Sequence, residues 1–265
     1  MSLSPLNKLR LSWHNENTFT VTFEAAPCVQ LTHIIAACLC AIRQCWGDDI
    51  LDGIPAYDSL MIVIDPWHET PDELAQQAMQ LCEREFLSGA VSQQRPSEQT
   101  CLTLSIPVLY HQSVAPDLRR VADFCGLTCG EVVELHARKT YTVCALGFAP
   151  GFPYLGFVDE RIATPRLATP RKSVPEGAVG IAETQTGIYP RQSPGGWNII
   201  GRTPVRCFDV ARPIAQASLF TVGQRVRFYA ISQAQYDNWP ADDPANSWGG
   251  KSPGAWAELV NQGRR

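Results

Sequence analysis

Arginine is concentrated in and beside one segment of the chain, residues 147–204, which is also rich in proline and glycine. Recognition of a phosphate or a carboxylate needs charge-assisted hydrogen-bond donors, and the planar guanidinium offers two of them side by side. Any single arginine here could equally be a solvated loop residue without a functional role, but we do not expect this of all of them. We take Arg166, Arg171 and Arg202 as candidate catalytic cations, with Arg191 as a further basic residue of the segment.

Other residue types in this segment suit the binding of a small molecule. Gly195 and Gly196 carry no Cβ, so backbone N–H groups can approach a ligand closely there; the alternative is that they only serve a tight turn. Amide and hydroxyl side chains could orient an amide group, and Gln185 joins the catalytic candidates. The aromatic residues could form an apolar wall or could equally be core residues. The candidate substrate-binding residues are Pro150, Gly151, Phe152, Tyr154, Thr186, Tyr189, Ser193, Gly195, Gly196 and Trp197.

Acidic, histidine and cysteine residues add no recognisable catalytic motif. Glu176 and Glu183 could each act as a general base, but neither has a paired partner, so no role is assigned to them. His136 falls late in an expected helix and is interpreted as a capping or core residue. The ten cysteines and five histidines show no metal-ligand spacing. We therefore expect no metal site, and we interpret most of the cysteines as reduced core thiols of a cytoplasmic protein.

The composition of residues 147–204 indicates how these side chains are positioned. Proline and glycine recur every few residues, which excludes a helix of normal length. Disordered linkers are poor in aromatic residues, whereas Phe148, Phe152 and Tyr154 lie close together here. The segment is therefore predicted to form ordered loops between short strands. Loops that a rigid scaffold positions are the usual place for binding and catalysis.

Four sequence blocks follow one another in this segment: residues 147–155 (GFAPGFPYL), 164–171 (TPRLATPR), 180–190 (GIAETQTGIYP) and 193–204 (SPGGWNIIGRTP). In this order they resemble a known family that contains the B-type subunit of 5-oxoprolinase. The family, that of the carboxyltransferase C and D subdomains, also contains the Kip-type histidine-kinase inhibitor and allophanate-hydrolase subunit 1. A weaker resemblance extends from residues 54–57 to residues 226–228, so it covers most of the chain.

The resemblance implies a fold and an activity. It implies a cyclophilin-like β-barrel in the C-terminal half, and ATP-dependent opening of the 5-oxoproline lactam to glutamate, together with C-type and A-type partner subunits. ATP, with or without Mg²⁺, would be shared with these partners, and the isolated chain is predicted to be inactive. A carboxyltransferase subunit acting on a urea-like amide, and a non-catalytic inhibitor of a histidine kinase, are the alternatives. Glu183 departs from the family pattern and places a carboxylate near the substrate candidates.

The N-terminal half alternates between strand and helix patterns. A strand at residues 18–23 alternates apolar and polar residues, and a helix at 30–45 has apolar residues at helical spacing. Thr70, Pro71 and Glu73 form a helix start with a capping box. The order βαββαβ predicts a ferredoxin-like domain, and its last strand either closes this sheet or opens the second domain. The expected elements are strands at 18–23, 50–54, 60–64 and 101–106, and helices at 30–45 and 70–87.

The C-terminal half predicts two short helices and then many short strands with proline and glycine turns, a pattern typical of a barrel or sandwich. The whole chain is therefore expected to be an α+β protein of two domains, a ferredoxin-like one at 1–98 and a barrel at 99–239, with a poorly ordered polar tail at 240–265. The expected helices lie at 116–124 and from residue 128, where Thr128 and Glu131 have the spacing of a capping box. The expected strands lie at 141–146, 178–182, 198–200, 205–208 and 225–231.

The charge and hydropathy of the chain argue against two classes of partner. The net charge is −4, and no run of lysine and arginine provides a basic surface for nucleic acid or an anionic membrane. The longest apolar stretch, residues 34–42, is too short to span a bilayer, so we expect a buried helix there. We also expect no signal peptide. The expected ligand is thus a small molecule, and the expected partners are protein subunits.

Overall fold

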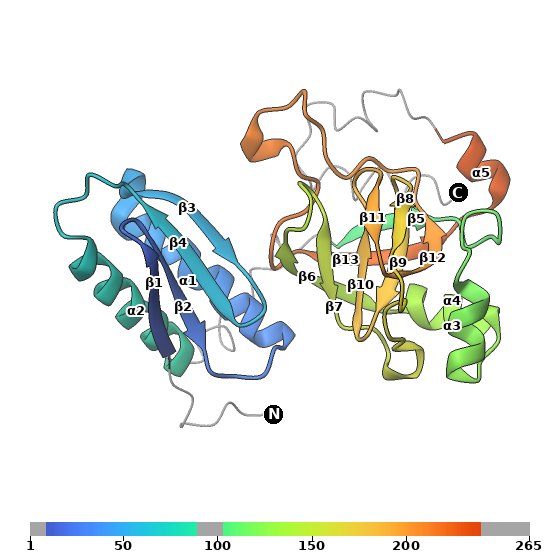
Figure 1. The fold of residues 1–265 in the computed structure, drawn as a ribbon, viewed down its shortest axis with the longest axis horizontal. Helices are drawn as coiled ribbons and strands as arrows, with labels where there is room; N and C mark the ends of the chain where they lie inside the picture. Colours follow the sequence, from blue (N-terminus) through green and yellow to red (C-terminus); the bar gives the residue numbers. More distant parts are fainter. Residues whose placement is uncertain (1–8, 89–102, 240–265) are drawn as a thin grey trace. The chain divides into compact units, whose positions relative to one another are not determined.

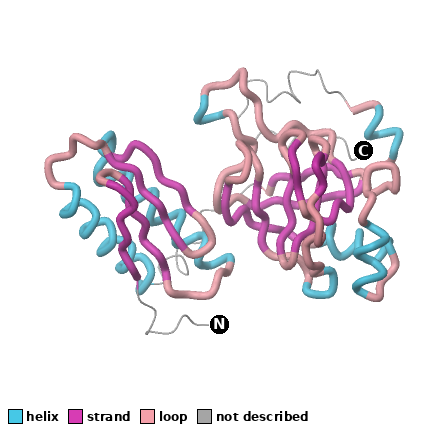
Figure 2. The backbone as a smooth tube through the Cα atoms, viewed as in Figure 1, coloured by secondary structure: helices cyan, strands magenta, loops and turns pink. Residues whose placement is uncertain are grey.

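The computed structural model describes residues 9–88 and 103–239. The chain divides into two compact units, residues 1–100 and residues 101–265 (Figures 1 and 2). Each unit combines strands with helices, so the chain is a mixed α/β protein, as the sequence predicted. The predicted tail at 240–265 lies outside the described residues.

The first unit is a four-stranded antiparallel sheet with two helices, whose strand order is β1-β2-β4-β3. Strands β2 and β4 alternate between half-buried and buried residues, so one face of the sheet carries the core. Both helices contribute side chains to that same core. The elements are β1 (Leu9–Asn15), β2 (Thr18–Phe23), α1 (Val29–Trp46), β3 (Ile50–Pro55), β4 (Ser59–Ile64) and α2 (Pro71–Ser88).

Helix α1 owes its position to one apolar stripe. Leu31, Ile35 and Ile42 are fully buried on it, at the helical spacing that places side chains on one face. By length and composition alone, this helix with the short turn after it is the one candidate membrane span among the described residues. Its stripe packs instead on the sheet and on α2, where it is part of the core of the first unit. The prediction of a buried helix around residues 34–42 is thus confirmed.

The predicted order βαββαβ is found along the chain as β2, α1, β3, β4, α2 and β5, but these elements do not form one unit, because the first unit has the order ββαββα. The sequence reading missed β1, although Leu9, Leu11 and Trp13 alternate with polar residues as a half-buried strand requires. The strand predicted at 101–106 is observed as β5, Leu104–Val108, and it pairs with β13 of the second unit. The local pattern identified a strand there but carried no information about its partner.

The second unit is built on a seven-stranded sheet of order β12-β9-β10-β7-β6-β13-β5. The two edges of this sheet meet where Leu109, next to β5, exchanges two backbone hydrogen bonds of 2.8 and 3.0 Å with Arg202 of β12. The sheet is therefore a nearly closed barrel. Its strands are β5, β6 (Thr140–Leu146), β7 (Pro153–Gly156), β9 (Ala178–Ala182), β10 (Gln185–Ile188), β12 (Asn198–Arg202) and β13 (Arg225–Ala230).

The remaining elements of the second unit lie around this barrel. A separate two-stranded sheet pairs β8 with β11, and helices α3 and α4 pack against each other and against β12 and β13. Helix α4 begins with a complete capping box of Thr128 and Glu131, which the sequence predicted. The strand predicted at 205–208 forms only a single bridge, between Phe208 and Ser218. The bounds are α3 (Leu118–Cys125), α4 (Cys129–Arg138), β8 (Arg171–Val174), β11 (Ser193–Gly195) and α5 (Gln233–Asp237).

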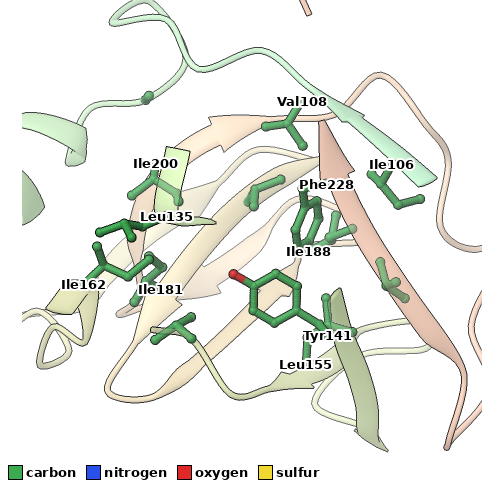
Figure 3. Packing of buried hydrophobic residues seen from close by; sticks show 14 of the residues in the cluster. Ile106, Val108, Leu135, Tyr141, Leu155, Ile162, Ile181, Ile188, Ile200 and Phe228 are labelled. Atoms are coloured by element: carbon green, nitrogen blue, oxygen red, sulfur yellow. The ribbon is translucent and has the colours of Figure 1, made fainter. Parts of the chain in front are cut away.

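The core of the second unit fills the inside of the barrel. Leu155, Ile181 and Ile188 converge there from β7, β9 and β10, with Phe228 of β13 beside them (Figure 3). Alternate residues of the same strands point outward, as the period of two requires. The outward face of these strands carries the candidate site.

Candidate functional site

A second, smaller core covers the outside of the barrel and consists largely of predicted site residues. On β9, Val179 and Ile181 belong to the inner core, whereas Ala178 and Ala182 belong to the second core. We call the rings of this second core the outer aromatic layer. They are Phe152, Tyr154, Tyr189 and Trp197, with Phe148 at the edge.

The rings of the outer aromatic layer pack mostly edge to face. Phe152 lies at the centre, with its ring centroid 4.9 Å from that of Tyr154, 5.2 Å from Tyr189 and 5.5 Å from Trp197. Phe152 is 1% exposed, whereas Phe148 is 61% exposed. Of the two alternatives given for the aromatic residues, Phe152 is therefore a core residue, because its ring is buried by its own neighbours.

Glycines let these rings lie close to the sheet. A Cβ on Gly187 would lie 2.8 Å from the Pro153 carbonyl oxygen and 3.0 Å from the ring of Phe152. A Cβ on Gly195 would collide with the hydroxyl of Tyr189. Gly196 differs, because the nearest atom to its Cβ would be 3.6 Å away, an ordinary contact. Close packing thus accounts for Gly195, and it does not account for Gly196.

Polar groups border the outer aromatic layer along the β8–β11 sheet. Arg171 donates from Nη2 to Oδ1 of Asp117 at 2.6 Å, and Oδ2 of Asp117 accepts the backbone N–H of Ile199 at 2.7 Å. Asp117 is almost completely buried, so this ion pair fixes the guanidinium. The other nitrogen, Nη1 of Arg171, is buried and has no hydrogen-bond partner, and the same holds for Oγ of Ser193.

The two phenols in the layer stay protonated at neutral pH. Burial raises the pKa of Tyr189 to about 12, against the opposing effects of the Trp197 backbone N–H and of the charges on Arg166 and Arg171. Burial also raises the pKa of Tyr154, and Arg166 again opposes the shift. The cations, the phenols and Ser193 therefore form a group of hydrogen-bond donors beside an apolar wall, which suits an anionic oxygen.

Thr186, predicted to bind substrate, lies inside the barrel instead. Its hydroxyl donates to the Gly180 carbonyl at 2.9 Å, so it accepts from Nε2–H of His136, also at 2.9 Å. Nδ1 of that ring must then accept from the hydroxyl of Tyr110, at 2.7 Å. His136 is fully buried and stacks on Phe228, and burial lowers its pKa to about 3. The interpretation of His136 as a core residue is confirmed.

The other predicted site residues occupy separate places. Arg202 lies at the closure of the barrel, where its Nε donates to the Glu176 carbonyl at 2.8 Å. Gly151 adopts a φ of 80° and packs against Phe208. Pro150, Arg166 and Arg191 are exposed, and Gln185 is half-buried on β10. The structure therefore brings Arg166 and Arg171 together with Tyr154, Tyr189 and Ser193, but it places Thr186 and Arg202 elsewhere.

Sequence reasoning missed two residues from helix α3 and the turn before it. Asp117 holds Arg171, and Arg120 donates from Nη1 to Oδ1 of the buried Asn198. Asn198 in turn donates to the carbonyls of Pro165 and Ile181, at 2.9 and 3.1 Å. An aspartate directly before a helix normally indicates an N-cap, yet Asp117 makes no side-chain capping bond. No pattern in the sequence linked these residues to partners more than fifty positions away.

The cysteines and acidic residues add no metal site in the part of the chain that the structure describes. No three His, Cys, Asp or Glu side chains there are grouped so that they could hold a metal ion. Among the described cysteines, Cys38, Cys82, Cys144 and Cys207 are buried, whereas Cys40 and Cys45 are exposed.

Comparison with known proteins places this arrangement in a family. The family model of the carboxyltransferase domain, subdomain C and D, matches residues 9–219. The chain belongs to this family. The matched range includes described elements of both units and the whole outer aromatic layer.

Two relatives named as the B-type subunit of 5-oxoprolinase show considerable sequence identity. The chain is 39% identical over 180 residues to that of Escherichia coli O157:H7, and the match covers 68% of this chain and 78% of the relative. It is 36% identical over 211 residues to that of Bacillus subtilis (strain 168), covering 78% of this chain and 86% of the relative.

Solved structures share the fold. The protein TTHA0988 superposes with a TM-score of 0.67 and 33% sequence identity. The match covers 82% of this chain and 40% of TTHA0988, which is longer. Kluyveromyces lactis urea carboxylase matches with a TM-score of 0.64 and 15% identity, covering 96% of this chain and 27% of the enzyme. At that identity the match to urea carboxylase concerns the fold alone.

Proposed function

We propose that this chain is the B-type subunit of an ATP-dependent 5-oxoprolinase, which opens the lactam of 5-oxoproline to glutamate. The observation that carries the proposal is the similarity to two relatives that bear this name, at 39% and 36% identity over most of their length. The chain acts with C-type and A-type subunits in the cytoplasm, and it has no detectable activity alone.

The donor group beside the outer aromatic layer supports a role in binding an activated amide. A lactam carbonyl is a poor electrophile, and a phosphoryl group from ATP, with Mg²⁺ as its companion, would make its oxygen a leaving group. Such a step needs cations and positioned donors more than a protein nucleophile. Arg171, held by Asp117, and Arg166 with the two phenols can orient an anionic oxygen of the substrate. The apolar rings keep bulk water away from it.

We also propose specific fold names for the two units. In the first unit, β2, α1 and β3 form a split βαβ with β4 between the strands, and β1 occupies the edge that a fourth strand takes in the ferredoxin-like fold. This is a circularly permuted version of the predicted arrangement. We propose a cyclophilin-like barrel for the second unit, supported by its nearly closed seven-stranded sheet.

A carboxyltransferase subunit acting on a urea-like amide is the second candidate. The family model of the carboxyltransferase domain, subdomain C and D, favours it. Both candidate reactions act on an amide and stabilise an anionic oxygen, so the donor group suits either. The substrate of the assembled complex decides between them.

Reconstitution tests the proposal. The chain is co-expressed with C-type and A-type subunits, and the purified complex is assayed for glutamate formed from 5-oxoproline, with and without ATP. We expect ATP-dependent turnover by the complex and none by the single chain at the same concentration. A stable complex that leaves 5-oxoproline intact contradicts the proposal, and biotin-dependent carboxylation of urea by that complex supports the second candidate.

A further inference from the structure

Two buried polar atoms without partners lie on the same small sheet. Native proteins satisfy nearly all buried donors, because an unpaired one costs free energy. Nη1 of Arg171 on β8 and Oγ of Ser193 on β11 are such atoms, and the two strands pair with each other. Two unsatisfied donors on one two-stranded sheet are more than packing explains, and they indicate a ligand that accepts hydrogen bonds from both.

The register of this sheet places both donors on the face toward the outer aromatic layer. Arg171 pairs directly with Gly195, whose missing Cβ would point at the hydroxyl of Tyr189. Ser193 lies two residues before Gly195 and pairs with Val174, a residue of the same outer core. Residues opposite each other share a face of a sheet, and the register shift between Ser193 and Gly195 lets both pairs face the same side although Arg171 and Val174 are three residues apart. Both unpaired donors therefore face the side on which Tyr189 lies.

The guanidinium is oriented before any ligand binds. Nη2 of Arg171 is engaged by Asp117, which is itself held by the backbone N–H of Ile199. Asp117 balances one positive charge, so the charge of Arg166 remains in excess beside Tyr189. An excess of one positive charge and two donors on one face of the sheet match a carboxylate, which has one charge and two oxygens. A phosphate carries up to two charges and three free oxygens, and would leave more of its oxygens unpaired here.

We propose that Arg171 Nη1 and Ser193 Oγ bind the carboxylate of the small cyclic amide on which the complex acts. The carboxylate accepts one hydrogen bond from each donor, and the outer aromatic layer contacts the ring of the substrate. This assignment rests on the proposed function for the identity of the substrate, since 5-oxoproline carries one carboxylate beside its lactam. The two residues are thus specificity determinants that separate 5-oxoproline from amides without an acid group.

The test compares two ligands that differ only in the carboxylate. Binding of 5-oxoproline and of pyrrolidinone is measured by calorimetry on the full chain and on its complex with partner subunits. The variants are Ser193→Ala and Arg171→Lys, because lysine keeps a charge for Asp117 but loses the second planar donor. Matched controls are Ser218→Ala, whose hydroxyl already has backbone partners, and Arg119→Lys, whose side chain is 80% exposed.

We expect each test variant to weaken binding of 5-oxoproline about tenfold or more, as for the loss of a hydrogen bond to a charged group. Binding of pyrrolidinone should be unchanged, and neither control should alter either ligand. Ser193→Ala should not lower the melting temperature, because it removes a buried hydroxyl without a partner.

Other results overturn the proposal. If the variants weaken the binding of both ligands equally, or if neither variant weakens the binding of 5-oxoproline, then Arg171 and Ser193 do not bind the carboxylate. If inorganic phosphate binds and loses affinity in both variants, whereas the affinity for 5-oxoproline does not change, the two donors bind a phosphate instead. If the complex neither binds nor hydrolyses 5-oxoproline, but acetate binds and loses affinity in both variants, the carboxylate subsite stands and the proposed function fails.

Discussion

The inner and outer faces of the barrel differ in whether their buried polar groups have hydrogen-bond partners. Inside, Tyr110, His136, Thr186 and the Gly180 carbonyl form one continuous chain of donors and acceptors. Outside, beside the outer aromatic layer, Arg171 and Ser193 each keep a buried donor without a partner. A satisfied polar chain fixes the packing of a core, whereas unsatisfied donors lower stability and are retained where a ligand completes them. The difference separates the scaffold of this barrel from its binding surface.

The largest expected effect concerns the centre of the outer aromatic layer. Phe152→Ala should lower the free energy of unfolding by about 3–5 kcal/mol, because the ring is buried among four other rings. Phe148→Ala is the matched control, and its mostly exposed ring should cost under about 1 kcal/mol. Urea unfolding of both variants measures this. Similar small losses in both would show that the layer is a loose surface and not a second core.

A smaller effect depends on pH and belongs to the inner face. His136 is neutral in the folded protein because burial lowers its pKa to about 3, whereas an unfolded histidine has a pKa near 6.5. Below pH 6.5 the unfolded state takes up a proton that the folded state does not, so stability falls as the pH is lowered toward 3. The loss at pH 5 should be about 2 kcal/mol relative to pH 7.

The variant His136→Gln isolates this contribution. It is less stable than the parent at every pH, but its further loss between pH 7 and pH 5 should be smaller by about 2 kcal/mol. Urea unfolding at the two pH values measures both losses. Equal losses in the parent and the variant would mean that His136 is not held neutral in the core.

Local patterns predicted most elements of this fold. Apolar spacing gave α1 and a helix-start pattern gave α2, each to within a few residues, and the capping box of Thr128 and Glu131 marked the start of α4. What failed was partner choice. The strand β5 was recognised, yet its hydrogen bonds go to β13, more than one hundred residues later. Pairing between distant strands depends on the whole sheet, and a local pattern does not contain it.

The candidate site was predictable as a segment but not residue by residue. The aromatic and glycine residues of 147–204 do form one surface, because Gly187 and Gly195 let rings approach the sheet. The period of two decides the rest: Thr186 points into the barrel, whereas its neighbour Gly187 lies under Phe152 on the outside. Asp117 and Arg120 were missed because they reach the site from a helix distant in sequence.

The contrast between the two faces is tested most directly by removing one hydroxyl from each. Thr186→Val keeps the shape of the side chain but leaves Nε2–H of His136 unpaired, so it should cost about 1–3 kcal/mol of unfolding free energy. Ser193→Ala removes a buried hydroxyl without a partner and should leave stability unchanged or slightly higher. Urea unfolding of the two variants under one condition gives both values. A loss of more than about 1 kcal/mol in Ser193→Ala, or none in Thr186→Val, would contradict the account.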